Sequence, residues 1–286
     1  MTRRGPSRPG RLSRILTPIL SAASAALYRG PLRRAISGAL ERNRRVTHPV
    51  IALGRGAAGL SGLRLAFLSD VHLGNYFGAD DWVRVCERVA QESPDLVCLG
   101  GDLVSAWEEE ALELRKGLAL LAPPLGVFAV PGNHEYWATP DPRVFVSVLE
   151  ESGIELLVNR GVRIARGGAT LWLCGVDDLR RGAPDVAAAL AGRLPDEPAV
   201  LLSHQPDLFP EAVLHGVDLQ ISGHTHGGQI VLGGWAPITH SRYGLWTGRY
   251  ARAGAQLYVS RGVGTTALPL RIGAPGEIAM LELEVR

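Results

Sequence analysis

Ile221-Ser-Gly-His-Thr-His-Gly-Gly-Gln-Ile230 is the stretch from which the organisation of this chain can be worked out. Strand-like runs flank it, from residue 217 to 221 and from 229 to 232. His224 and His226 therefore follow a strand end, in a loop loosened by three glycines, where both imidazoles can be aimed at one point. Histidine is the commonest protein ligand for transition metals. A turn with two solvated histidines would have the same sequence, so the choice depends on other candidate ligands in the chain.

The composition predicts a folded protein with a large core and two regions of opposite charge. Of 286 residues, 46% are hydrophobic and 20% are charged, which excludes global disorder. Residues 1–45 contain eleven arginines and one acid, Glu41. Residues 46–286 contain 19 basic and 27 acidic residues, a net charge of −8. A basic arm therefore precedes an acidic body.

The three cysteines fit neither a disulfide framework nor a zinc pattern, because their spacings are unrelated and they lie in apolar runs. Cys86, Cys98 and Cys174 are interpreted as reduced core thiols of a cytosolic protein. No apolar run reaches the ~20 residues that a membrane-spanning helix needs.

The basic arm, residues 1–45, has an apolar stripe with the period of a helix. The stripe comprises Leu12, Ile15, Leu16, Ile19, Leu20, Ala23 and Leu27, and continues with Leu32, Ile36, Ala39 and Leu40. A basic amphipathic helix suits an anionic membrane surface, so we expect residues 11–45 to hold the protein at the inner face of the membrane. Two alternatives are a signal peptide, suggested by Arg3-Arg4 and Ala23-Ser-Ala25, and a helix or tail without a membrane role.

Strand-like and helical stretches alternate along residues 46–286, which are interpreted as one domain. Strands are predicted at 63–69, 95–100, 126–130, 171–176, 199–203, 217–221, 257–260 and 278–285, and helices at 80–93, 107–121 and after Asp141-Pro142. Asp80 is expected to cap the first of these helices. The early alternation predicts a parallel sheet, and the strand-rich C-terminal half predicts a second sheet packed on it.

Five of the predicted strands are each followed by metal-ligand side chains. They are Asp70 and His72, Asp102, Asn133 with His134, His204, and His224 with His226. Ligands in such folds gather at the carboxyl ends of strands, so these side chains are expected at one edge. Imidazole, carboxylate and amide together suit Mn, Fe or Zn better than a dedicated Ca or Mg site. Even without His134, the other seven side chains exceed the needs of one ion, which predicts two divalent ions sharing a carboxylate.

The order of these motifs resembles the signature of the calcineurin-like metallophosphoesterase superfamily. That signature is Asp-x-His, Gly-Asp, Gly-Asn-His-Asp/Glu, a lone His and Gly-His-x-His, and it is found here at 70–72, 101–102, 132–135, 204 and 223–226. The resemblance covers about residues 46–286 and implies an α/β fold, a four-layer α/β/β/α sandwich carrying the amphipathic arm. It implies one metal on Asp70, His72 and His226, a second on Asn133, His204 and His224, and Asp102 as the bridge. His134 would be the general acid, or alternatively an orienter of Asp102.

Later segments resemble one bacterial branch of that superfamily, the membrane-associated phosphodiesterases. They are Gly223–Ile230, Tyr243–Tyr250, Tyr258–Gly264 and Leu270–Glu277. The branch includes enzymes that cleave UDP-2,3-diacylglucosamine in lipid A synthesis. The resemblance implies a hydrolase that cleaves a phosphodiester or pyrophosphate bond in a lipid-linked or membrane-proximal substrate. Mn is the expected metal, with Fe or Zn as alternatives.

Side chains beside the motifs are candidates for substrate contact. Asn75, Tyr76, Tyr136 and Trp137 should rim the site, and Arg242, Arg261 and Arg271 could meet a second phosphate, although each could equally be a surface arginine. Within the enzyme class, the alternative is a soluble phosphodiesterase or phosphatase for nucleotides. A non-catalytic scaffold is a further alternative, disfavoured because every ligand is present. No specific nucleic-acid binding is expected, because the body is acidic.

Overall fold

The computed structural model describes residues 33–56, 58–74, 76–106, 108–138 and 143–285. Within these residues no helix is both long and apolar enough to cross a membrane. Residues 1–32 of the basic arm, which contain most of the apolar stripe and the candidate signal, lie outside the described ranges, as does Asn75.

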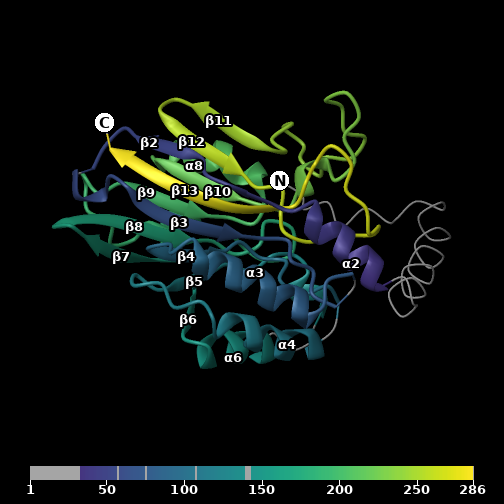
Figure 1. Ribbon diagram of the computed structural model, residues 1–286. Coiled ribbons are helices and arrows are strands. Elements are labelled where there is room, and N and C mark those ends of the chain that lie inside the picture. Colours follow the sequence, from purple (N-terminus) through teal and green to yellow (C-terminus); the bar gives the residue numbers. More distant parts are fainter. Residues whose placement is uncertain (1–32, 57, 75, 107, 139–142, 286) are drawn as a thin grey trace.

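A seven-stranded sheet carries the N-terminal half of the site (Figure 1). Its order is β1-β13-β3-β4-β5-β6, and β2 also pairs with β13. The strands are β1 (Arg45–Thr47), β2 (Val50–Leu53), β3 (Leu63–Leu68), β4 (Leu96–Leu99), β5 (Val127–Ala129), β6 (Ile154–Leu156) and β13 (Glu277–Val285). All pairs are parallel except β13 with β3, so β3, β4 and β5 end at the same edge.

A six-stranded sheet, in the order β11-β12-β10-β9-β8-β7, packs against the first. Its strands are β7 (Arg160–Arg166), β8 (Ala169–Gly175), β9 (Ala199–Leu202), β10 (Leu219–Ser222), β11 (Gly248–Arg252) and β12 (Ala255–Val259). The strands β8, β9, β10 and β12 run parallel, whereas β7 and β11 are antiparallel edge strands.

Helices cover the outer faces of both sheets, which confirms the predicted four-layer arrangement. The helices are α2 (Arg33–Arg42), α3 (Ala79–Gln91), α4 (Glu108–Leu118), α5 (Glu135–Ala138), α6 (Arg143–Glu151), α7 (Val186–Ala189) and α8 (Phe209–Leu214), with 3-10 turns η1 (Ala58–Leu60), η2 (Pro206–Leu208) and η3 (His226–Gly228). One buried cluster joins α3, α4 and α6 to the first sheet, a second fills the space between the sheets, and a third joins α7 and α8 to the second sheet. The three cysteines are free and buried, as expected of core thiols.

Two local predictions were wrong. Residues 229–232 do not form a strand, because Gly227, Gly228 and Gln229 all have positive φ, which turns the chain out of the extended conformation. Asp80 does not cap α3. Gly78 is the N-cap, and its N–H donates to the carboxylate of Asp81 at 2.9 Å.

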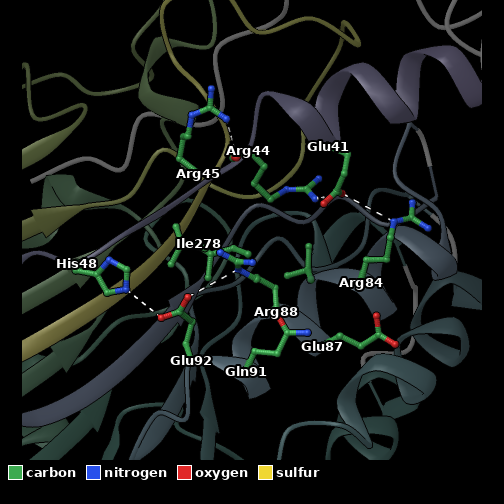
Figure 2. Close-up of a pocket in the computed structure, with 12 residues that line it drawn as sticks. Glu41, Arg44, Arg45, His48, Arg84, Glu87, Arg88, Gln91, Glu92 and Ile278 are labelled. Atoms are coloured by element: carbon green, nitrogen blue, oxygen red, sulfur yellow. Dashed lines mark hydrogen bonds and ion pairs between the residues drawn. The ribbon is translucent and has the colours of Figure 1, made fainter.

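Helix α2 shows that the C-terminal part of the basic arm is docked on the domain. A pocket of about 650 Å³ lies between α2, β1 and α3. Figure 2 shows the residues that line it. Arg84 of α3 lies 4.0 Å from Glu41 of α2, and Glu92 lies 3.8 Å from Arg88 and 3.0 Å from His48. Acids and bases therefore alternate around this pocket, which leaves it without a strong field of one sign.

Candidate metal centre

The strand-end loops that carry the candidate ligands have an unusual backbone. Five non-glycine residues there have φ between 50° and 69°: Asp70, His72, Asp102, His224 and His226. Left-handed non-glycine residues are uncommon and cluster at functional sites. Hydrogen bonds between loops maintain this conformation, since the N–H of His72 donates to the carbonyl of Asp102 at 3.0 Å and the N–H of His224 to the carboxylate of Asp70 at 3.0 Å.

One group of donors is formed by Asp70, His72 and His226, all buried. The Nε2 atoms of His72 and His226 lie 3.0 Å apart, and Nε2 of His226 lies 3.5 Å from Oδ1 of Asp70. Strand β3 leads into the first two residues and β10 into the third, so the group spans both sheets.

A second group is formed by Asp102, His204 and His224, also buried. Nε2 of His204 lies 3.1 Å from Oδ2 of Asp102 and 3.1 Å from Nδ1 of His224. The buried Asn133 reaches the same region, where its Oδ1 lies 3.5 Å from the amide nitrogen of Gln205, the neighbour of His204.

Asp102 connects the two groups. Its Oδ2 lies 3.1 Å from Nε2 of His204 in the second group and 3.8 Å from Nε2 of His72 in the first. Its other oxygen, Oδ1, accepts the backbone N–H of His134 at 2.8 Å, which fixes the orientation of the carboxylate. The carboxylate is therefore placed to be shared.

The donors fit divalent cations in spacing and chemistry. Ligand bonds of about 2.1 Å at right angles separate two nitrogens by about 3.0 Å, which is the spacing found here. Nε2 of His224 is buried without a hydrogen-bond partner among the described residues. Burial, reinforced by the neighbouring His134, lowers the pKa of His72 to about 3, and burial also lowers the pKa of His224 and His226, which favours the neutral, ligating imidazole. Burial opposes protonation of His204 too, but the adjacent Asp102 carboxylate outweighs it and raises the pKa to about 10.

Outer hydrogen bonds select the ring nitrogens that face the centre. Nδ1 of His204 donates to the carbonyl of Gly100 at 2.7 Å, which leaves Nε2 as its donor atom. Nδ1 of His134 donates to the carbonyl of Ser105 at 2.6 Å, and the half-buried ring lies edge-on to the rings of His72 and Trp137. His134 therefore presents Nε2 beside the first group.

Glu135 was not assigned a role from the sequence, although it belongs to a quoted motif. Its carboxylate is buried and accepts backbone N–H groups from two loops, at 2.7 Å from Gly132, 2.9 Å from Asp102, 2.7 Å from Leu103 and 3.4 Å from Val104. It ties the loop after β4 to the loop after β5, and so sets the position of the shared carboxylate. Its place as the acid of the Gly-Asn-His-Asp/Glu motif is the sequence feature that could have identified this role.

Arg271 does not fit the predicted role of a phosphate contact, because its nitrogens are occupied inside the protein. The buried guanidinium donates to backbone carbonyls of His226 at 3.0 Å and Ala274 at 3.1 Å, and to those of Arg261, Gly262 and Gly264. It supports the loop that carries His226 instead. The sequence gives no sign of this, since buried and exposed arginines look alike.

The remaining candidate contacts differ in their exposure. Tyr136 is exposed and its hydroxyl donates to Asp177, whereas Tyr76 is buried. Arg261 pairs with Glu277 at 3.2 Å, and its side chain lies against Gly227. Arg242 is exposed, and its guanidinium carbon lies 5.3 Å from the centre of the Tyr243 ring.

Two rim residues were missed by the sequence analysis. The ring of His240 lies 5.8 Å from that of His224, and Arg180 donates to the carbonyl of His240 at 3.0 Å. Both come from irregular loops outside the motifs, so only the fold brings them to the centre.

Comparison with known proteins agrees with this geometry. The family description "Calcineurin-like phosphoesterase" matches residues 63–228, which include the ligand-bearing loops. A metallophosphoesterase of Helicobacter pylori is 36% identical over 77% of this chain and 60% of its own length. YkuE, a metallophosphoesterase of Bacillus subtilis, is 33% identical over 79% of this chain and 80% of its own. A "Transmembrane protein with metallophosphoesterase domain" of Danio rerio is 32% identical over 79% of this chain and 54% of its own. The chain thus spans only about 60% of the H. pylori relative.

Proposed function

The chain belongs to the calcineurin-like phosphoesterase family, and from this premise we propose that it is a hydrolase that uses two divalent cations to cleave a phosphodiester or pyrophosphate bond. The observation that supports the proposal best is the pair of buried donor groups that share Asp102. Asp70, His72 and His226 would hold one cation, and Asn133, His204 and His224 the other. Mn is the proposed metal, with Fe or Zn as alternatives, because the donors are mixed nitrogen and oxygen.

Cations bound there would lower the pKa of a water molecule and offset charge on the phosphate oxygens. The protein must then supply a proton to the leaving oxygen. His134 suits this task because its Nδ1 proton is held by the carbonyl of Ser105, so that a second proton would sit on Nε2, which faces the centre. A leaving group that is already a weak base has little need of this proton.

For the substrate we propose a lipid-linked or membrane-proximal phosphodiester or diphosphate, with UDP-2,3-diacylglucosamine as the compound to test. Two observations support a site near a membrane at its inner, cytoplasmic face: the basic arm, and the name of the D. rerio relative. We propose Tyr136, Arg242 and Arg261 as substrate contacts. Tyr136 follows Glu135 in α5, and the side chain of Arg261 lies against Gly227, next to His226. Arg242 follows by two residues His240, whose ring lies 5.8 Å from that of His224.

The experiment compares two substrates on protein that has been stripped of metal and then supplied with Mn. We expect hydrolysis of both bis(p-nitrophenyl) phosphate and UDP-2,3-diacylglucosamine, with loss of both activities in Asp102→Ala. His134→Ala should lose less activity than Asp102→Ala on both substrates, because nitrophenolate and the phosphate monoester released from the diphosphate are both weak bases. The exposed His215→Ala is the matched control and should be unchanged. Cleavage of the diester alone would refute the lipid-linked substrate, and cleavage of neither would refute the hydrolase.

A further inference from the structure

Two joined loops beside the metal centre display a group of exposed apolar side chains. The loops, residues 229–238 and 266–272, are joined by the N–H of Val231 to the carbonyl of Ile272 at 2.8 Å and by the N–H of Ile272 to the carbonyl of Gln229 at 3.0 Å. Six of their large apolar side chains are 40–65% exposed. We call this group the apolar ledge, and it comprises Leu232, Trp235, Ile238, Leu268, Leu270 and Ile272. Single exposed apolar side chains are ordinary, but six on two joined loops mark an interaction surface.

The apolar ledge is attached to the metal centre through both loops. The first loop continues directly from η3, which begins with His226. The second contains Arg271, between Leu270 and Ile272, and its guanidinium donates to the carbonyl of His226 at 3.0 Å. Whatever covers the apolar ledge is therefore placed beside the donor groups.

The charges around the apolar ledge favour an anionic partner. The two loops contain no acidic residue, and their one charged side chain, Arg271, is buried. Helix α2 lies at the same end of the molecule as these loops (Figure 1), and the chain after it is bonded to the second loop by the side chain of Asn43, which donates to the carbonyl of Arg271 at 3.2 Å. Arg34, Arg42 and Arg45, on α2 and at the start of β1, are exposed, whereas the one acid of α2, Glu41, is paired with Arg44 at 2.5 Å.

An apolar surface with arginines beside it fits an anionic bilayer better than a second copy of this chain. Two copies meeting through this surface would bring their arginines together, and like charges repel. In a bilayer, the aliphatic side chains would lie at the headgroup–acyl boundary, where tryptophan is also favoured, while arginines meet anionic headgroups.

We propose that the apolar ledge inserts into the surface of an anionic membrane and so places the metal centre against the lipid headgroups. The membrane contact stands on the exposed side chains and charges alone, whereas its consequence for catalysis rests on the proposed function. The proposal assigns membrane contact to the apolar ledge and not to residues 1–32 of the basic arm.

Co-sedimentation with vesicles tests this. The full chain should bind vesicles of phosphatidylglycerol and phosphatidylcholine more tightly than phosphatidylcholine alone. The double variant Trp235→Ser/Ile238→Ser should weaken that binding by about tenfold or more, because two large apolar side chains no longer leave water. Leu214→Ser is the matched control, since Leu214 is 85% exposed and precedes β10, at the opposite edge of the sheet from the centre. Unchanged hydrolysis of bis(p-nitrophenyl) phosphate without vesicles would show that the variants are folded.

A second readout separates the apolar ledge from the arm. Lipids brominated near the headgroup should quench tryptophan fluorescence in the vesicle-bound protein, and Trp235→Phe should remove that quenching. Vesicle binding that persists in the double variant, together with quenching in the unmodified chain that Trp235→Phe does not remove, would overturn the proposal and assign binding to the arm. Dissociation of a dimer by the double variant, with vesicle binding unchanged, would overturn it in favour of a protein interface. If the unmodified chain hydrolyses neither substrate but still binds through Trp235, the proposed function fails and the membrane contact stands.

Discussion

Replacing Glu135 with glutamine should loosen the metal centre without removing any ligand. One carboxylate oxygen accepts the N–H groups of Gly132 and Asp102, and the other accepts those of Leu103 and Val104. A glutamine keeps one acceptor and turns an NH₂ group toward the other pair of N–H donors. Two hydrogen bonds to a charged acceptor are lost, each worth ~1.5–3 kcal/mol. The free energy of unfolding should therefore fall by about 3–6 kcal/mol.

Urea denaturation of metal-free protein measures this loss, and titration with Mn measures its effect on the centre. We expect Glu135→Gln to bind Mn more weakly as well, because the backbone of Asp102 is no longer fixed. The exposed Glu113→Gln on α4 is the matched control and should change stability by less than about 0.5 kcal/mol. A Glu135→Gln protein as stable as the parent would refute the reasoning, since the glutamate would then not be acting as a charged acceptor for the two loops.

Three further predictions concern the same centre. Gly132→Ala should abolish hydrolysis measured with bis(p-nitrophenyl) phosphate, because a Cβ there would lie 2.3 Å from Oδ1 of Asp102; activity within about twofold of the parent would contradict it. Removal of metal should lower the melting temperature measured by calorimetry, since an ion at 100 times its Kd contributes about 2.7 kcal/mol; an unchanged melting temperature would show that no ion binds the folded state. Arg271→Met should weaken Mn binding and destabilise the fold by about 3 kcal/mol or more in urea, because buried carbonyls lose their donor, and an intact Mn affinity would argue against support of His226.

The sequence predicted the central architecture because the motifs and the buried strands coincide. β4 is buried at every residue and β3 at every residue except Arg64, so their sequences are almost continuous apolar runs. Their ends carry the ligand types, and parallel pairing then forces Asp70 and Asp102 to one edge.

Other strands could not be predicted, for physical reasons. β7 and β11 lie at sheet edges and have mixed, partly exposed side chains, so they lack a clear apolar run. β1 and β6 are three residues long and depend on their partners for existence.

The finer features of the site were also beyond local patterns. The outer supports Glu135 and Arg271 act through backbone groups of distant segments, which no spacing in the sequence reveals. The strand wrongly predicted at 229–232 is a further case. The run looks like a strand because it is apolar, but the positive φ of Gly227 and Gly228 before it turns the chain out of the extended conformation.

The central claim, two cations held by donors that share Asp102, is tested most directly by metal stoichiometry measured together with activity. Metal-free protein would be titrated with Mn, the bound ion counted after gel filtration, and hydrolysis of bis(p-nitrophenyl) phosphate followed at each ratio. The account predicts two bound ions per chain, activity that appears as the second ion binds, and loss of that activity in Asp102→Ala. A single bound ion at full activity, or two bound ions in Asp102→Ala with activity unchanged, would contradict it.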